Sequence, residues 1–176
     1  QSRSDLVCRL LLEKKKNWHL PKAQKSLSVL INTAHPDASF ETKGIRFASK
    51  EEIFENADII SLHCPLRKDN AGFINRDTIA KMKDGVILIN TARGGLINEY
   101  DLAEALKSGK VAGAGLDVLA VEPAGPGNPL VGLKNCIITP HIAWSSNEAR
   151  KKVVEMTVEN LRAFLRGERL NCVTPI

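Results

Sequence analysis

Short apolar runs alternate with helical segments along most of this 176-residue chain, and the alternation limits the folds that it can adopt. Most of the runs are apolar throughout, which is typical of parallel strands that are covered on both faces. The predicted strands lie at residues 27–32, 57–63, 86–90, 111–118 and 136–140. The sequence therefore predicts the α/β class, with a Rossmann-like, doubly wound parallel sheet.

Residues that begin or end helices occupy the segments between these runs. A serine followed three residues later by glutamate resembles a capping box, and glycine ends helices because it adopts the left-handed backbone conformation. Such signals predict four helices, which start near Ser49, Arg76, Asn98 and Ser145. The last three are predicted to end near Gly85, Gly109 and Arg166.

The composition is that of a globular protein. Apolar residues make up 43% of the chain and charged residues 26%, which excludes the disordered and fibrous classes. The formal net charge of +5 is spread along the sequence. Its densest cluster, Lys14–Lys16, is better explained as a solvated helix end than as a nucleic-acid site, so we expect no nucleic-acid partner.

The cysteines indicate a reducing compartment. Cys8, Cys64, Cys136 and Cys172 lie far apart without the spacing of a zinc site, so reduced thiols and no metal are expected. No apolar segment approaches the roughly 20 residues that span a bilayer, and the N-terminal residues lack the layout of a signal peptide. The expected compartment is the cytoplasm, without a membrane partner.

Charged side chains follow three of the predicted strands where each strand ends. They are Arg93, Asp117, Glu122 and His141. Ligands of open parallel sheets bind beyond the carboxyl ends of the strands. We therefore expect these four side chains to meet at one edge of the sheet.

These residue types suit the interconversion of a 2-keto acid and a 2-hydroxy acid. The planar guanidinium of Arg93 matches a carboxylate. His141 can give a proton to a carbonyl oxygen as hydride arrives at carbon, or take the proton back in the reverse direction. A carboxylate from Glu122 would favour the protonated imidazole and fix its orientation.

Each of these residues also has a structural explanation. Arg93 alone could pair on the surface, His141 could be a packing histidine, and Glu122 could be an ordinary loop residue. Their arrival at neighbouring strand ends is a joint condition that the separate explanations do not predict.

Several long motifs resemble the cofactor domain of the D-isomer-specific 2-hydroxyacid dehydrogenase family, over about Leu27 to Val173. They include ADIISLHCPL, INTARGGLINEYDLAEAL, LDVLAVEP and NCIITPHIAW. The last two most resemble the glycerate dehydrogenase (hydroxypyruvate reductase) branch. The resemblance implies an oxidoreductase that transfers hydride between nicotinamide and an acid such as hydroxypyruvate or D-glycerate.

The resemblance also implies roles for single residues. Arg93 would bind the substrate carboxylate, His141 would act as acid and base, and Glu122 would support His141. Cofactor contacts are implied at His63, Cys64, Pro65, Thr91, Ala92 and Asp117. A homodimer is expected, because relatives dimerise through the cofactor domain.

The end of the strand at 27–32 is expected to set the cofactor preference. The chain offers Asn32, Thr33, Ala34 and His35 there, with neither the acid usual for NAD nor an arginine for a 2′-phosphate. We expect Thr33 to contact the cofactor and NAD to be preferred, with NADP left open.

One part of a dinucleotide site has no counterpart in the sequence. No glycine precedes Gly44, so no G-x-G-x-x-G turn lies before the strand at 27–32. The central first strand of the sheet is then missing, and the sheet must close up, recruit the LVCRLLL run or be unstable. This chain alone is therefore expected to reduce hydroxypyruvate poorly or not at all.

We divide the chain into three parts. They are a helix-like segment and junction (1–26), a nucleotide-binding domain without its first βα unit (27–144), and a long helix and tail toward the substrate domain (145–176). Two other interpretations stay open. One is a non-catalytic binding or scaffold protein, like the family's transcriptional corepressors, and the other is a remnant that functions only with an intact subunit.

Overall fold

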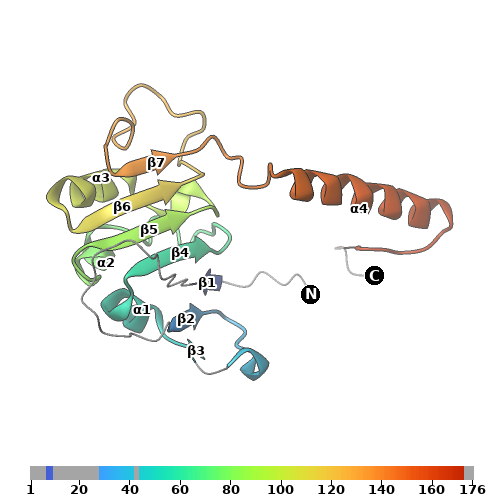
Figure 1. Cartoon of the computed structure of the whole chain (residues 1–176), viewed down its shortest axis with the longest axis horizontal. Coiled ribbons are helices and arrows are strands. Elements are labelled where there is room, and N and C mark those ends of the chain that lie inside the picture. Colours follow the sequence, from blue (N-terminus) through green and yellow to red (C-terminus); the bar gives the residue numbers. More distant parts are fainter. Residues whose placement is uncertain (1–6, 10–27, 42–43, 173–176) are drawn as a thin grey trace.

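A seven-stranded sheet organises the chain in a computed structural model that describes residues 7–9, 28–41 and 44–172. Its spatial order is β3-β2-β1-β4-β5-β6-β7 (Figure 1). The strands are β1 (Val7–Arg9), β2 (Val29–Asn32), β3 (Ile45–Phe47), β4 (Ile59–His63), β5 (Val86–Asn90), β6 (Val111–Leu116) and β7 (Cys136–Ile138). The order and the intervening helices give the α/β, Rossmann-like fold that the sequence predicts.

The central strand β1 departs from the parallel pattern. Every other pairing in the sheet is parallel, whereas β1 is antiparallel to both β2 and β4. Of the three outcomes considered for a missing first strand, the structure shows recruitment of the N-terminal apolar run. Helix-like structure was expected over residues 1–26 and is wrong at Val7–Arg9; the rest of that segment lies outside the described residues.

The helices begin where polar side chains cap them. They are α1 (Lys50–Asn56), α2 (Arg76–Ala80), α3 (Glu99–Ser108) and α4 (Asn147–Leu165), with 3₁₀ turns η1 (Ala38–Phe40) and η2 (Gly94–Leu96). Ser49 caps α1 by accepting the Glu52 N–H, and Asn98 caps α3 by accepting two N–H groups. Gly109 ends α3 at a φ of 79°, as predicted.

Three details of the helix predictions are wrong. The Glu52 carboxylate pairs with Arg46 instead of completing a capping box, and α2 ends at Ala80 rather than near Gly85. Helix α4 is capped by Ser146, whose hydroxyl accepts the Ala149 N–H, and not by Ser145.

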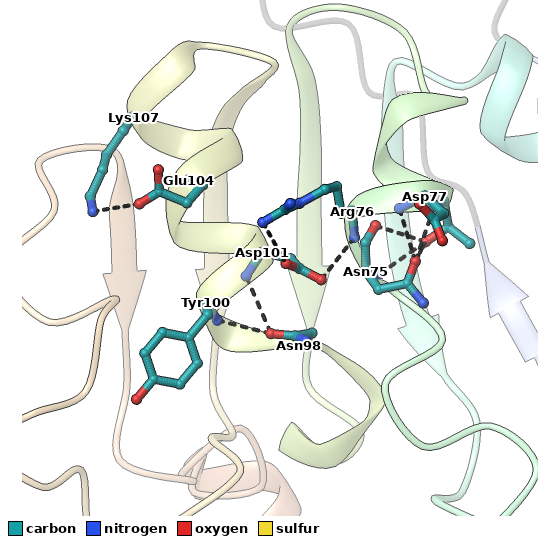
Figure 2. A network of polar contacts seen from close by, with 9 residues as sticks. Asn75, Arg76, Asp77, Asn98, Tyr100, Asp101, Glu104 and Lys107 are labelled. Atoms are coloured by element: carbon teal, nitrogen blue, oxygen red, sulfur yellow. Dashed lines mark hydrogen bonds and ion pairs between the residues drawn. The ribbon is translucent and has the colours of Figure 1, made fainter.

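Helices α2 and α3 are joined by polar contacts near their amino ends (Figure 2). One carboxylate oxygen of Asp101 accepts the Arg76 backbone N–H at 3.0 Å, and the other lies 3.7 Å from the Arg76 guanidinium. Asn75 caps α2 through the Asp77 and Thr78 N–H groups. The start of α3 is thereby held against α2.

The core lies between the sheet and helices α1 to α3. It includes fully buried side chains from β4, β5 and α3, among them Ile60, Leu62, Leu88 and Leu102. The sheet is not buried evenly: the side chain of Ile87 in β5 is 37% exposed and that of Ile137 in β7 is 70% exposed. Helix α4 projects away from the sheet (Figure 1), and several of its apolar side chains are exposed.

Candidate active site

The strand ends line up in one row across the sheet. Pairing places these residues side by side in the order Asn32, Cys8, Leu62, Asn90, Leu116 and Ile138. The residue that follows each row member on the parallel strands therefore lies at the same edge; these are His63, the last residue of β4, and Thr33, Thr91, Asp117 and Thr139, which directly follow β2, β5, β6 and β7. The register thus brings most of the predicted site residues to a single edge.

The loop that carries Arg93 is held by a buried asparagine. Asn90 is fully buried at the end of β5. Its side chain donates to the Arg93 carbonyl at 2.9 Å and accepts the Ala92 N–H at 3.0 Å, and its own carbonyl accepts the Asp117 N–H at 2.9 Å. The Arg93 side chain is exposed, and its Nη1 donates to the Ala92 carbonyl at 2.6 Å.

Glu122 and His141 form a hydrogen-bonded pair. Nδ1 of His141 lies 2.7 Å from Oε2 of Glu122, and Oε1 of Glu122 accepts the Leu119 N–H at 2.9 Å. The bond with His141, followed by the one from Leu119, lowers the pKa of Glu122. The glutamate is therefore ionised at neutral pH, as a partner of a protonated imidazole must be.

The backbone of His141 is held in an uncommon conformation. Its φ of 55° lies in the left-handed region, which few residues other than glycine adopt. Its N–H donates to the Thr139 carbonyl at 3.0 Å, and its carbonyl accepts the Trp144 indole N–H at 3.0 Å. Such backbone conformations cluster at functional sites, where surrounding contacts fix them.

Asp117 ties the His141 loop to the sheet. The carboxylate is buried and accepts the Thr139 hydroxyl, the Ile142 N–H at 3.0 Å and the Ala143 N–H at 2.8 Å. Burial raises the pKa of Asp117, but these hydrogen bonds outweigh burial, so that the pKa is lowered overall. Asp117 thus stays charged and fixes the residues on both sides of His141.

Arg93, Glu122 and His141 line one hollow of about 270 Å³. Its remaining walls are Leu66, Gly94, Gly95, Leu119 and Ala120. The hollow therefore offers a cationic fork and an imidazole–carboxylate pair above small apolar walls, which suits a small organic acid.

Comparisons with known proteins agree with this geometry. The family model described as D-isomer specific 2-hydroxyacid dehydrogenase, NAD binding domain, matches residues 22–143. This chain belongs to that family. It is similar to the hydroxypyruvate reductase of Blautia hydrogenotrophica (48% identical, covering 84% of this chain and 46% of the relative) and to the glycerate dehydrogenase of Methylorubrum extorquens (46% identical, covering 70% and 40%).

A solved structure has the same fold. The D-lactate dehydrogenase of Lactobacillus jensenii with NAD⁺ aligns with a TM-score of 0.75 at 33% identity, covering 84% of this chain and 48% of that one. The chain spans 40 to 48% of the length of these three proteins.

Three of the residues expected to contact the cofactor, His63, Cys64 and Pro65, lie at and just after the end of β4. Cys64 is buried, and burial raises the pKa of its thiol. The Asn70 side chain fixes this loop, because it donates to the Pro65 carbonyl at 2.9 Å and accepts the Arg67 N–H at 2.7 Å. The ring of His63 contacts the Ser61 hydroxyl at 2.8 Å.

The residues after β2 and β5 complete this edge. The hydroxyl of Thr33 accepts the His35 N–H at 3.3 Å, and Asn32 donates to the Ala48 carbonyl at 2.9 Å. Thr91 is exposed and Ala92 is half-buried. The contacts of these residues and of Asp117 with the cofactor stay predictions.

The chain fits one half of NAD better than the other. The residues at the ends of β4, β5 and β6 form one row at the sheet edge, in a domain whose family model is described as NAD binding. Strand β1, however, is antiparallel to its neighbours and directs its carboxyl end to the opposite edge. A helix N-terminus that binds pyrophosphate follows the carboxyl end of a parallel first strand, and the carboxyl end of β1 lies at the other edge.

Sequence reasoning missed the residues that hold these loops in place. They are Asn70, Asn90, Glu99 and Trp144, which contact the loops through hydrogen bonds to backbone groups or to neighbouring side chains. A buried polar residue at the end of an apolar strand, as at Asn90, is the signal that could have been used.

Two features are absent from the described residues. Within residues 7–9, 28–41 and 44–172, no group of three or more His, Cys, Asp or Glu side chains could hold a metal ion. Across the same described residues, no helix is both long and apolar enough to cross a membrane.

Proposed function

We propose that this chain carries the catalytic residues of an NAD-dependent 2-hydroxyacid oxidoreductase. Its substrate pair is a 2-keto acid and 2-hydroxy acid such as hydroxypyruvate and D-glycerate. The observation that carries the proposal is the 2.7 Å contact of His141 with Glu122 in the hollow that Arg93 also lines. The names of the relatives, which include hydroxypyruvate reductase and glycerate dehydrogenase, support the choice of acid.

In the proposed reaction, Arg93 binds and orients the substrate carboxylate. One N–H of its guanidinium donates to the Ala92 carbonyl, and a guanidinium has five N–H donors. The fork can therefore hold a carboxylate with two parallel hydrogen bonds while it stays attached to its own loop.

His141 moves the proton. Because Nδ1 is engaged by Glu122, Nε2 is the nitrogen that faces the substrate. Nicotinamide, when bound, supplies the hydride to the carbonyl carbon. In that direction the proton passes from Nε2 to the carbonyl oxygen and leaves a neutral imidazole bonded to Glu122. In oxidation His141 takes the hydroxyl proton back.

The cofactor preference, assembly and compartment form part of the same proposal. We propose NAD as the preferred cofactor, a homodimer as the assembly and the cytoplasm as the compartment. The free thiols of Cys64, Cys136 and Cys172 support a reducing compartment. Calorimetric titration with NADH and NADPH tests the preference, and sedimentation analysis tests the dimer.

The proposed function is tested by separate measurements of binding and turnover. Hydroxypyruvate and D-glycerate are titrated into the 176-residue chain by NMR, and NADH oxidation is followed with hydroxypyruvate. We expect binding of either acid to shift the NMR signals of Arg93, Gly94 and His141. Arg93→Lys should weaken binding about tenfold, because an ammonium cannot reproduce the bidentate contact.

Arg76→Lys is the matched control, since Arg76 lies on α2 outside the hollow. Absence of binding, or equal weakening by both variants, would contradict the proposal. Slow or absent NADH oxidation by this chain alone is the expected result, so the binding measurements decide whether the proposal stands.

A further inference from the structure

The loop that carries Glu122 has few packing contacts of its own. Residues 120–127 are all exposed, and the nearest buried side chains on either side are Leu119 and Leu130. The segment is rich in proline and glycine, which gives it little apolar surface to bury. Something other than the core must therefore set the position of Glu122.

Glu99, the first residue of α3, contacts the first residue of this exposed segment and the residue that follows its end. Its Oε1 accepts the Ala120 N–H at 2.7 Å, and its Oε2 accepts the Asn128 side-chain N–H at 2.8 Å. Asn128 in turn accepts the Leu130 N–H at 2.9 Å through its side chain. One carboxylate thus closes the loop across eight residues and attaches it to a helix.

The Leu119–Ala120 backbone is where these contacts reach the candidate site. The Leu119 N–H donates to the Glu122 carboxylate, and the next N–H along the chain, that of Ala120, donates to the Glu99 carboxylate. The same backbone packs against Gly94, next to Arg93, and lines the hollow. A movement of Leu119 and Ala120 would therefore change the distance of Glu122 from both His141 and Arg93.

We propose that Glu99 is a positioning residue for the Glu122–His141 pair. It holds the Leu119–Ala120 backbone so that the Glu122 carboxylate stays aligned on Nδ1 of His141. The role rests on the proposed function of that pair. Glu99 itself does not line the hollow, so it acts through Glu122 and not on the substrate.

A simpler explanation is that Glu99 only stabilises α3. An acidic side chain in the first turn of a helix interacts favourably with the helix dipole. Asp101 stands in the same first turn but contacts Arg76 rather than the loop. Glu99→Gln and Asp101→Asn therefore remove equivalent charges from the helix, and only the first changes the loop contact.

The test uses NMR on the 176-residue chain and does not depend on turnover. Glu99→Gln should let the Leu119 and Ala120 amides exchange about tenfold faster, which corresponds to the loss of roughly one hydrogen bond. It should also raise the pKa of Glu122 toward its ordinary value, measured from the side-chain carboxyl ¹³C shift. Asp101→Asn should change neither quantity.

A second variant guards against a general loss of folding. Asn128→Ala removes one of the two contacts of Glu99 and leaves α3 intact. It should raise the amide exchange rates of Leu119 and Ala120 and the pKa of Glu122, each by less than Glu99→Gln does. Equal behaviour of wild type and Glu99→Gln, or an Asp101→Asn effect as large as that of Glu99→Gln, would overturn the proposal.

A third variant separates this proposal from the proposed function. His141→Asn removes the largest cause of the lowered pKa of Glu122, so that pKa should rise. If it does not rise, the Glu122–His141 pair and the proposed function both fail. If it rises while Glu99→Gln has no effect, only the positioning role of Glu99 fails.

Discussion

The backbone of Gly94 lies so close to that of Leu119 that an added Cβ would be 1.9 Å from the Leu119 carbonyl carbon. It would also lie 2.4 Å from the Ala120 nitrogen. The contact joins the Arg93 loop to the Glu122 loop, two segments that sequence alone does not connect. Glycine at position 94 is therefore a condition for Arg93 and Glu122 to share one hollow.

Gly94→Ala should separate the two loops. The clash is with backbone, which cannot rotate away, so we expect a loss of about 1 to 3 kcal/mol in the free energy of unfolding. Weaker binding of hydroxypyruvate should accompany it. Urea denaturation and NMR titration measure the two effects. Gly125→Ala is the control, because no atom lies within 4 Å of its added Cβ; equal effects at both positions would contradict the prediction.

Asp117→Asn should destabilise the chain in a pH-dependent way. An amide cannot accept all of the hydrogen bonds from Thr139, Ile142 and Ala143, so we expect a loss of about 1 to 3 kcal/mol at neutral pH. The folded pKa of Asp117 is lowered from its ordinary value of 3.8. The stabilisation is therefore complete above pH 3.8 and is lost as pH falls through the folded pKa.

Urea denaturation of wild type and Asp117→Asn between pH 3 and pH 7 measures this difference. The gap between the two should be widest near neutrality and should narrow in acid. Asp84→Asn, at an exposed carboxylate paired with Lys110, is the control and should change stability little. A gap that widens as pH falls would contradict the assigned direction.

Local signals made much of the fold predictable. Asn98 and Gly109 cap the two ends of α3 as predicted, because N-capping and a left-handed glycine depend only on neighbouring residues. The strands β2, β4, β5, β6 and β7 lie within the predicted runs, since each is long or apolar enough to recognise. Their register then placed Arg93, Glu122 and His141 at one edge.

The remainder depends on contacts between distant residues. Strand β3 has three residues and no recognisable period, and β1 takes its direction from its place between β2 and β4. Ser145 and Ser146 are adjacent, and only the backbone geometry decides which of them caps α4. Glu99 meets Ala120 across 21 residues, which no local pattern reveals.

Trp144→Phe should loosen His141 without removing an aromatic ring. The indole N–H donates to the His141 carbonyl at 3.0 Å, and His141 has a φ of 55°. Loss of one net hydrogen bond of about 1 kcal/mol should let the backbone leave the left-handed region part of the time. We expect the amides of His141 and Ile142 to exchange about fivefold faster.

The measurement is hydrogen exchange, followed by NMR. Phe164→Leu is the control, because Phe164 is 76% exposed on α4, away from the loop. Unchanged exchange at His141 in Trp144→Phe would show that Glu122 and Thr139 suffice to hold this residue.

The direction of β1 predicts how the chain binds its cofactor. Cys8 of β1 pairs with Asn32 and Leu62 in antiparallel register, so the carboxyl end of β1 lies opposite the edge of Thr33 and His63. A helix N-terminus at that edge would supply the N–H groups that bind a pyrophosphate. The chain should therefore gain little affinity from the pyrophosphate and adenosine of NADH.

Calorimetry should give affinities for reduced nicotinamide mononucleotide and for NADH that lie within about threefold of each other. A chain that binds the pyrophosphate well would separate the two affinities by more than tenfold. Asp117→Asn, at the proposed nicotinamide end, should weaken the binding of both ligands alike when measured under conditions where the variant is folded. Tight binding of NADH alone would mean that another part of the chain binds the pyrophosphate.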